Sequence, residues 1–230
     1  MTANIKIIFE DKNIIIVEKP QGIPTQSDKT NDESLFQTIN NNTNNEIFLI
    51  HRLDRPVGGI MIFAKNRKSC DFLSKQIQNK TLKKTYLAVV CGISKEEATL
   101  IDYIIKNERL NISKIVNKNN RGAKKAELSY KLIQTVNTPE YGFLSLLKIG
   151  LKTGRHHQIR VQLSNSGFPI WGDTKYNPDF GRKGKHKINF VKIALFSNSI
   201  QFINPTTNKA EQYIITPPNT FPFNLFAKDL

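Results

Sequence analysis

One carboxylate, Asp54, stands between two arginines in the segment HRLDRPVGG, which begins at His51. This segment leads directly into the apolar run Gly59–Ala64. Pro56 lacks the N–H that a sheet ladder needs and glycines permit unusual backbone angles, so we expect residues 52–58 to form a loop before a strand. Cations close to a carboxylate favour its ionised form. Asp54 is therefore a candidate nucleophile, and pairing with an arginine or capping its own turn is the alternative role.

A second group of polar side chains follows a predicted strand in LKTGRHHQIRVQL, which begins at Leu151. Gly154 breaks that strand, and we expect a helix over His157–Asn165. A helix N-terminus beside arginines suits an anion, either a phosphate or a carboxylate such as Asp54. Adjacent histidines diverge on a helix and no third ligand follows at a suitable spacing, so no metal site is predicted. The polar residues at this point are Arg155, His156, His157, Gln158 and Arg160.

A third segment, KKTYLAVV, places Lys83 and Lys84 before a predicted strand. Tyr86 in that strand could stack on a base, shuttle a proton or pack in the core. The basic stretches Asn119–Lys125 and Arg182–Lys187 could bind phosphates or form a solvated surface. Across the chain, 34 Lys and Arg against 19 acids give a net charge of +15. Such an excess suits a polyanionic partner, because neutralised phosphates release counterions.

Runs of β-branched and aromatic residues predict most of the elements that position these groups. Two helices are expected, one over residues 66–79, with Asn66 or Ser69 as its N-cap, and one over residues 157–165. The polar residues 10–13 favour a hairpin. The pattern predicts an α+β fold with a mixed, mostly antiparallel sheet and flanking helices. The expected strands are Ile5–Phe9, Ile14–Glu18, Gly59–Ala64, Tyr86–Cys91, Leu128–Val136, Phe143–Leu151, Phe190–Phe196 and Tyr213–Thr216.

Length and composition are those of an ordinary globular chain, with 230 residues of which 39% are hydrophobic. No linker separates autonomous domains, so a single domain over residues 1–230 is expected. No apolar run approaches the roughly 18 residues of a membrane span and no signal peptide is evident, which predicts a cytoplasmic location. Cys70 and Cys91 lack the spacing of a metal site or a disulfide framework.

Taken together, these motifs resemble the RluA family of RNA pseudouridine synthases. HRLDRPVGG, KKTYLAVV, GAKKAELSY and TGRHHQIRVQL follow one another in the family's order and spacing. The opening stretch IIFEDKNIIIVEKPQGIPTQ and the later segment GFPIWGDTKY are also similar to the family's, so the resemblance covers nearly the whole chain. A stand-alone catalytic domain without an S4-like RNA-binding domain is expected, because the catalytic pattern begins within the first ten residues.

The resemblance implies a pseudouridine synthase fold with a central RNA-binding cleft, acting as a monomer on structured rRNA or tRNA without a cofactor or metal. The reaction cuts the N1–C1′ bond of a uridine, rotates the base and rejoins it through C5. Attack at C1′ through a glycal and attack at C6 of the ring are both compatible with it. By match with the family, Asp54 is the nucleophile and Arg160 forms a salt bridge with it. Tyr86 stacks on the target base and takes part in proton transfer at C5.

The same resemblance assigns further positions. Leu195 matches an apolar residue that forms the pocket wall. The target base must be flipped out of its stack, and Arg52 matches a position that can fill the vacated space with its planar guanidinium. The residues predicted to bind RNA are Arg52, Arg55, Lys83, Lys84, Arg155, His157 and Gln158.

The chain departs from the family pattern where Val57-Gly58-Gly59 stands in place of the common Thr-Ser-Gly. If the two lost hydroxyls mainly shape the loop, Pro56 and Gly58 can replace that function and the chemistry survives. If one of them bonds the RNA, the choice of target shifts. Near the end of the sheet, Phe196-Ser197 replaces the family's His-Ala.

Two other classes of protein compete with an RNA isomerase. A non-catalytic RNA-binding protein of the same fold would keep the basic loops without needing Asp54, Tyr86 and Arg160, yet all three are present. A hydrolase would use paired carboxylates or a His-assisted nucleophile. No second acid accompanies Asp54 in its segment, which disfavours the hydrolase.

Overall fold

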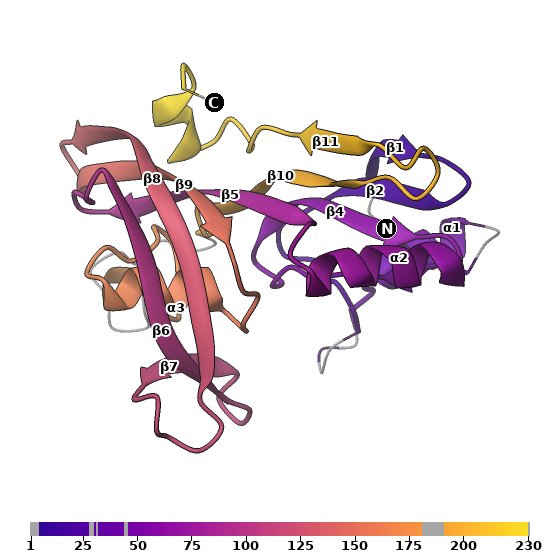
Figure 1. The fold of residues 1–230 in the computed structure, drawn as a ribbon. Helices are drawn as coiled ribbons and strands as arrows, with labels where there is room; N and C mark the ends of the chain where they lie inside the picture. Colours follow the sequence, from indigo (N-terminus) through magenta and orange to yellow (C-terminus); the bar gives the residue numbers. More distant parts are fainter. Residues whose placement is uncertain (1–4, 28–29, 31, 44–45, 181–190, 230) are drawn as a thin grey trace. The chain divides into compact units, whose positions relative to one another are not determined.

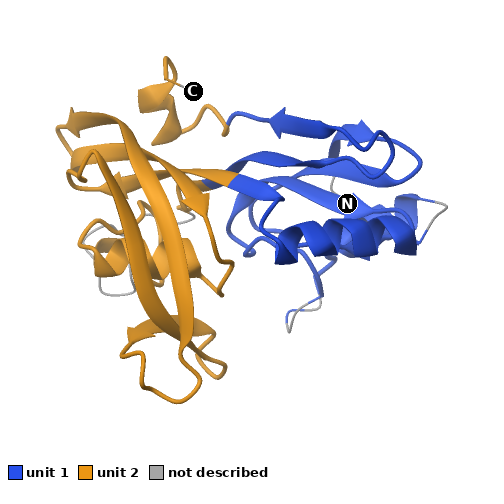
Figure 2. Ribbon diagram, in the orientation of Figure 1, with its two compact units in different colours: residues 1–84, 196–216 blue, residues 85–195, 217–230 orange. Residues whose placement is uncertain are grey.

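The computed structural model describes residues 5–27, 30, 32–43, 46–180 and 191–229. The chain divides into two compact units, residues 1–84 with 196–216 and residues 85–195 with 217–230 (Figure 2). The described helices are α1 (Leu35–Asn42), α2 (Arg67–Gln78) and α3 (Gln158–Asn165). The described strands are β1 (Lys6–Glu10), β2 (Ile14–Lys19), β3 (Phe48–Leu49), β4 (Gly58–Ala64), β5 (Lys83–Cys91), β6 (Glu97–Asn107), β7 (Ile112–Val116), β8 (Lys124–Thr138), β9 (Gly142–Leu151), β10 (Leu195–Ile203) and β11 (Ala210–Ile214).

In the first unit, β4 is the strand on which the others assemble. It pairs antiparallel with β2 and β3 and parallel with β10, and β1 and β11 extend the sheet by antiparallel pairing with β2 and β10. Every residue of β4 is buried. Its core neighbours include Ile14 and Ile16 of β2, Leu73 of α2 and Phe202 of β10. Asp54 lies on the loop that enters this strand, so a rigid element fixes one end of the loop.

Two helices pack on this sheet, and Figure 1 shows them on the same side of the strands. A capping box starts α1, because the Ser34 side chain accepts from the backbone N–H of Gln37 while the Gln37 side chain accepts from the N–H of Ser34. The amide oxygen of Asn66 caps α2 by accepting from the N–H of Ser69 at 2.9 Å. The buried side chain of Leu73 packs α2 against the core of this unit.

The second unit is built on an antiparallel sheet in the order β5, β9, β8, β6, β7. Figure 1 shows β6 and β8 as long strands side by side, with β7 at their far end. Helix α3 lies against β6 and β7, where its Val161 packs on Ile104 and Ala126. This contact fixes the position of α3, the helix that carries Arg160, in the second unit.

The observed architecture confirms the predicted α+β class and the mixed, mostly antiparallel sheet. The hairpin at residues 10–13 is confirmed, since the Asp11 carboxylate accepts from the N–H groups of Asn13 and Ile14 in the turn. The predicted helices are confirmed to within a residue at each end.

The predicted strand at Phe190–Phe196 is wrong at residues 191–194, because the regular strand starts at Leu195 and continues to Ile203. Residues 191–194 precede it without regular structure, and Ala194 makes single backbone hydrogen bonds with Val89 and Trp171. The apolar composition of this run predicted a strand, but it reflects the burial of these residues and not regular strand pairing. The strand predicted at 213–216 lies earlier, at Ala210–Ile214.

Among the described residues, no helix is long and apolar enough to cross a membrane. The basic stretch Arg182–Lys187 lies outside the described residues. A single domain over residues 1–230 with a central cleft stays a prediction.

Candidate active site

Three backbone groups of the Asp54 loop are bound by the segment that follows β2. The hydroxyl of Thr25 donates to the carbonyl of Leu53 at 2.8 Å and accepts from its N–H at 3.2 Å. The N–H of Gly22 donates to the carbonyl of Arg55 at 2.9 Å. The loop closes on itself where the N–H of Val57 donates to the carbonyl of Asp54, also at 2.9 Å. These bonds fix the backbone on both sides of Asp54, whose side chain is partly exposed.

A completely buried lysine, Lys19 at the end of β2, binds the same loop through its ammonium group. Its ammonium donates to the carbonyls of Pro20, Arg55 and Val57 at 3.0, 3.1 and 2.8 Å. Three carbonyls match the three N–H donors of an ammonium group. Burial lowers the pKa of Lys19 to about 7, against the opposing effect of the Asp54 carboxylate, which favours the charged form. The loop is thus bound by a lysine of β2 whose pKa lies close to neutral pH.

The side chain of Arg55 is bound to the same unit by three contacts. Nε donates to the carbonyl of Gly22 at 2.9 Å, Nη1 donates to the hydroxyl of Thr30 at 2.7 Å, and Nη2 pairs with the carboxylate of Asp32. These contacts tie the segment after β2 to the Asp54 loop a second time. RNA binding by Arg55 stays a prediction.

The departure from the family pattern has a structural explanation in β4. Val57 is buried, and a side chain at Gly58 would meet Gln21 Cγ at 2.9 Å and the carbonyl of Lys19 at 3.3 Å. Gly59 has a positive φ of 123°, and a Cβ there would lie 2.3 Å from the carbonyl oxygen of Ser197 on β10. These positions face the protein interior, which favours the alternative in which they shape the loop.

Four further cations or potential cations lie in this unit, two in the Asp54 segment and two at the start of β5. His51, at its start, is buried and accepts from the N–H of Ile62, and burial holds its pKa well below its ordinary value. Lys84, the second residue of β5, is half-buried, and burial lowers its pKa to about 8. Lys83 and Arg52 are exposed. The predicted RNA contacts of Arg52, Lys83 and Lys84 stay predictions.

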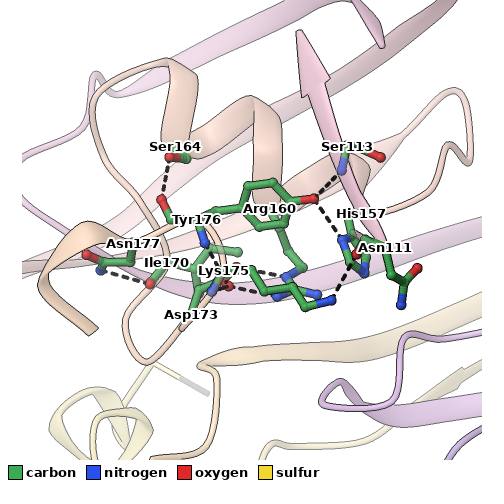
Figure 3. Close-up of polar contacts among 10 residues, drawn as sticks. All are labelled: Asn111, Ser113, His157, Arg160, Ser164, Ile170, Asp173, Lys175, Tyr176 and Asn177. Carbon is green, nitrogen blue, oxygen red and sulfur yellow. Dashed lines mark hydrogen bonds and ion pairs between the residues drawn. The ribbon is translucent and has the colours of Figure 1, made fainter. Parts of the chain in front are cut away.

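In the second unit, Arg160 is held by a buried carboxylate that sequence reasoning missed. Its Nε and Nη2 donate to the two oxygens of Asp173 at 2.8 and 2.7 Å (Figure 3). Asp173 also accepts from the N–H groups of Lys175 at 3.0 Å and Tyr176 at 3.2 Å. Only 3% of Arg160 and 1% of Asp173 are exposed. A bidentate bond of this kind fixes the plane of the guanidinium.

The first turn of α3 is anchored by its own polar residues. His157 is the N-cap residue, in the left-handed region at φ 52°, and its Nδ1 lies 2.8 Å from the hydroxyl of Tyr176. Burial lowers the pKa of His157 to about 2, and the charge of Arg160 adds to that effect. The buried Gln158 accepts from the hydroxyl of Thr153 and the N–H of Arg155, while the exposed Arg155 donates to the carbonyl of Lys125. RNA contacts by His157, Gln158 and Arg155 stay predictions.

The remaining predicted residues are both buried. Tyr86 lies in β5 opposite Ile149 of β9, with 5% of its surface exposed. Leu195 is the first residue of β10, with 3% exposed. Asp54 belongs to the first unit, whereas Arg160, Tyr86 and Leu195 belong to the second, so the meeting of these four stays a prediction.

Positive charge gathers on what we call the basic arm, residues 106–125, which comprise the end of β6, all of β7 and the start of β8. It contains seven Lys or Arg residues and one acid, Glu108. Lys118 and Arg121 in the β7–β8 loop are exposed. Lys125, at the base of the arm, pairs with Glu127, and hydrogen bonds from Lys152 and Lys125 lower the pKa of Glu127 to about 2. A predominantly positive surface of this kind suits a phosphate backbone.

Among the described residues, no cluster of His, Cys, Asp and Glu could hold a metal ion.

Solved structures identify the class of protein that this fold defines. The human RNA pseudouridylate synthase domain containing 1 superposes with a TM-score of 0.77 at 20% identity, over 96% of this chain and 86% of that chain. The human domain containing 4 gives 0.76 at 19% identity, over 96% and 92%. The fold is therefore that of the pseudouridine synthases.

Sequence comparisons then establish the family. The family model for RNA pseudouridylate synthase matches residues 13–165. The ribosomal large subunit pseudouridine synthase C of Buchnera aphidicola subsp. Schizaphis graminum is 33% identical over 225 residues, which cover 94% of this chain and 68% of the relative. The tRNA pseudouridine synthase C of Haemophilus ducreyi is 32% identical over 213 residues, which cover 87% and 86%. The chain belongs to this family, whose members convert uridine to pseudouridine in RNA.

The share of each relative that the chain spans is uneven. It covers 64% of an uncharacterised RNA pseudouridine synthase of Mycoplasma genitalium at 33% identity, against 86% of the Haemophilus ducreyi enzyme. Their printed targets also differ, since the Buchnera relative is named for the large ribosomal subunit and the Haemophilus relative for tRNA.

Proposed function

We propose that this chain isomerises specific uridines to pseudouridine in structured rRNA or tRNA, with Asp54 as the nucleophile. One observation carries the proposal. In a chain of this family, the single acid of HRLDRPVGG stands on a loop whose backbone is bound on both sides by Thr25, Gly22 and Lys19. A nucleophile works best when its surroundings hold it in the attacking geometry.

The reaction needs only the substrate's own atoms. The N1–C1′ bond breaks, the uracil ring rotates, a C5–C1′ bond forms, and the hydrogen on C5 leaves as a proton while N1 gains one. An isomerisation of this kind requires no oxidant and no external group, so we propose that no cofactor takes part. The carboxylate of Asp54 adds covalently to the nucleotide and leaves again at the end.

Arg160 has the chemistry to keep such a carboxylate ionised in a dry pocket. A guanidinium carries five N–H donors in a fixed plane, so the bidentate bond with Asp173 is compatible with a second carboxylate. We assign Asp54 as that second partner. An opposite charge in contact with an Asp lowers its pKa and offsets the desolvation that would raise it.

The other assignments follow the same logic. Tyr86 presents a buried aromatic face for the target base, and Leu195 forms an apolar wall beside it. Arg52 is exposed next to the nucleophile and fills the space left by the flipped base. Lys83, Arg155 and the basic arm bind phosphates. A protein with this chemistry acts where RNA is made and matured, so a cytoplasmic monomer is part of the proposal.

Release of tritium from C5 of uridine tests the proposal directly. The purified protein is incubated with total tRNA or with ribosomal RNA transcripts that carry tritium at C5. Wild type is expected to release label from one pool, and Asp54→Asn is expected to release none, because an amide is a poor nucleophile. The matched control is Asp71→Asn, which alters an exposed aspartate of α2 and should release label like wild type.

Two results would count against the proposal in different ways. If Asp54→Asn releases label at the wild-type rate, the nucleophile is assigned wrongly although the activity stands. If wild type and both variants bind RNA but release nothing from either pool, the non-catalytic RNA-binding protein of the same fold is the better description.

A further inference from the structure

The hydroxyl of Tyr176 joins two separate elements of the second unit. It accepts from the backbone N–H of Ser113 on β7 at 2.6 Å, and it lies 2.8 Å from Nδ1 of His157, the N-cap residue of α3 (Figure 3). Because its oxygen already accepts from Ser113, the hydroxyl can donate its own proton to that nitrogen. One phenolic group therefore ties the basic arm to the start of α3.

The ring of the same tyrosine lies against Arg160. The guanidinium carbon is 5.1 Å from the centre of the ring, within the range of a cation–π contact. The backbone N–H of Tyr176 donates to Asp173, the carboxylate that binds Arg160. Its carbonyl accepts from the hydroxyl of Ser164 on α3 at 2.6 Å. Tyr176 thus contacts the face of the guanidinium and also holds the carboxylate at its edge.

The neighbouring residues reinforce this connection. The hydroxyl of Ser113 donates to the carbonyl of His156 at 2.8 Å and lies 2.9 Å from its Nδ1. The ring of His156 stacks on that of His157, with centroids 3.7 Å apart. Lys175 donates to the carbonyl of Asn111, just before β7. His157 holds a left-handed backbone conformation, which is strained for a residue with a side chain and persists only where its surroundings impose it.

We propose that Tyr176 is a positioning residue for the isomerisation: it sets the orientation of Arg160 by linking that guanidinium to β7 through its hydroxyl and its ring. The proposal rests on the function proposed above, because it assigns Tyr176 a role through Arg160. Tyr176 does not touch the reacting atoms in this assignment. Since β7 forms part of the basic arm, RNA bound on the arm stands on the same strand that fixes the arginine.

The informative variant is Tyr176→Phe, which keeps the ring over Arg160 and removes only the hydroxyl. Without it, the N–H of Ser113 and Nδ1 of His157 each lose a partner, and α3 keeps only the bonds of Ser113 with His156 as its connection to β7 at this point. The rate of tritium release in a single turnover should fall by about tenfold or more, while the affinity for RNA stays within about twofold. The rate of tritium release should fall further in Tyr176→Leu, which also removes the ring.

Exchange of the Arg160 Nε proton with water, followed by ¹H–¹⁵N NMR, reports on the arginine independently of activity. This proton is bonded to Asp173 and buried, so it should exchange slowly in wild type and about tenfold faster in Tyr176→Phe. The matched control is Tyr130→Phe, which removes the hydroxyl of another buried tyrosine of the same unit, on β8. It should leave both the exchange rate and the release of tritium unchanged.

Each outcome decides the proposal. Slower chemistry together with faster Nε exchange supports it. Unchanged chemistry in Tyr176→Phe, whatever its exchange rate, overturns it, and so does slower chemistry with wild-type exchange, because Tyr176 would then not act on the reaction through Arg160. If wild type itself releases no tritium, the proposed function fails, and the exchange rates alone still show whether Tyr176 orients Arg160.

Discussion

Arg160 and Asp173 form a buried ion pair in which both carboxylate oxygens accept from one guanidinium, at 2.8 and 2.7 Å. Taking two charges out of water costs several kcal/mol, and the pair recovers this only through good geometry and further hydrogen bonds. Asp173 has both, since two backbone N–H groups also donate to it. The stability of the second unit therefore depends on this pair more than on any exposed one.

Asp173→Asn should lower the free energy of unfolding by about 3 to 5 kcal/mol, because it removes the charge that two guanidinium N–H groups bind in the interior. Urea unfolding followed by circular dichroism measures this change. The matched control is Asp71→Asn, which breaks the exposed pair with Arg67 on α2 and should cost no more than about 0.5 kcal/mol. A loss of under about 1 kcal/mol for Asp173→Asn would show that the pair contributes little.

Lys19 should make the stability of the protein rise with pH above neutrality. Its pKa is about 7 in the folded protein and 10.5 ordinarily, so between these values the unfolded chain holds a proton that the folded chain has lost. Stability rises with pH wherever the unfolded state binds more protons, with a slope of up to about 1.4 kcal/mol per pH unit for one group. Lys84, with a pKa of about 8, acts in the same direction.

Comparison of wild type with Lys19→Met isolates the contribution of Lys19. Urea unfolding at about pH 7 and about pH 9 should show a gain for wild type that is clearly smaller in the variant. The variant should also be less stable at both values, because the carbonyls of Pro20, Arg55 and Val57 lose their donor. Equal gains in the two proteins would mean that Lys19 keeps its proton across this range.

Arg55→Lys should weaken the attachment of Gly22, Thr30 and Asp32 to the Asp54 loop although it conserves the charge. A lysine can replace one of the three contacts that the guanidinium makes with Gly22, Thr30 and Asp32, but it lacks the fork that makes all three. Faster amide exchange at Gly22, whose N–H donates to the carbonyl of Arg55, is the expected result.

RNA affinity distinguishes this structural role of Arg55 from phosphate binding. If the three contacts are its main function, Arg55→Lys and Arg55→Ala both increase amide exchange and tritium release falls in both. If phosphate binding is its main function, Arg55→Lys behaves like wild type and only Arg55→Ala lowers the salt dependence of RNA binding.

The basic arm should account for a measurable part of the salt dependence of RNA binding. Each phosphate contact contributes about 0.7 to 0.9 to the slope of log affinity against log salt concentration. Lys118→Ala with Arg121→Ala should therefore reduce the slope by about 1.5 and weaken different RNAs by similar factors. Lys68→Ala with Lys75→Ala on α2 removes the same charge elsewhere, and an equal reduction there would show that the effect is not specific to the arm.

Local patterns predicted the elements that have strong boundaries. Asn66 caps α2 with its side chain and Asp11 closes the first hairpin, and both residues act through hydrogen bonds to nearby backbone that the sequence makes visible. β6 and β7 were missed, although β6 alternates in burial along much of its length. The short helix α1 was missed too, because its capping box lies at Ser34 and Gln37 within a polar stretch that hides it.

In the candidate site too, the sequence predicted some residues and missed others. Motif residues such as Asp54 and Arg160 stand out by type and spacing, whereas their supports do not. Lys19 directly follows the predicted strand Ile14–Glu18, and only the tertiary structure shows three carbonyls around its ammonium. Asp173 was missed, although it is the lone acid in the largely apolar segment GFPIWGDTKY, and that position is the signal that could have identified it as a buried partner of an arginine.

The parallel pairing of β4 with β10 also determines when, during synthesis, the Asp54 loop can reach its final structure. The hydroxyl of Ser197 on β10 donates to the carbonyl of Ile60 on β4, across 137 residues of chain. All of residues 85–195 leave the ribosome between these two strands, and closing so long a loop costs entropy before any contact compensates for it. A nascent chain stopped before residue 196 would already contain Asp54, yet it would lack the strand that pairs with β4, so translation must pass β10 before the Asp54 loop is fully supported.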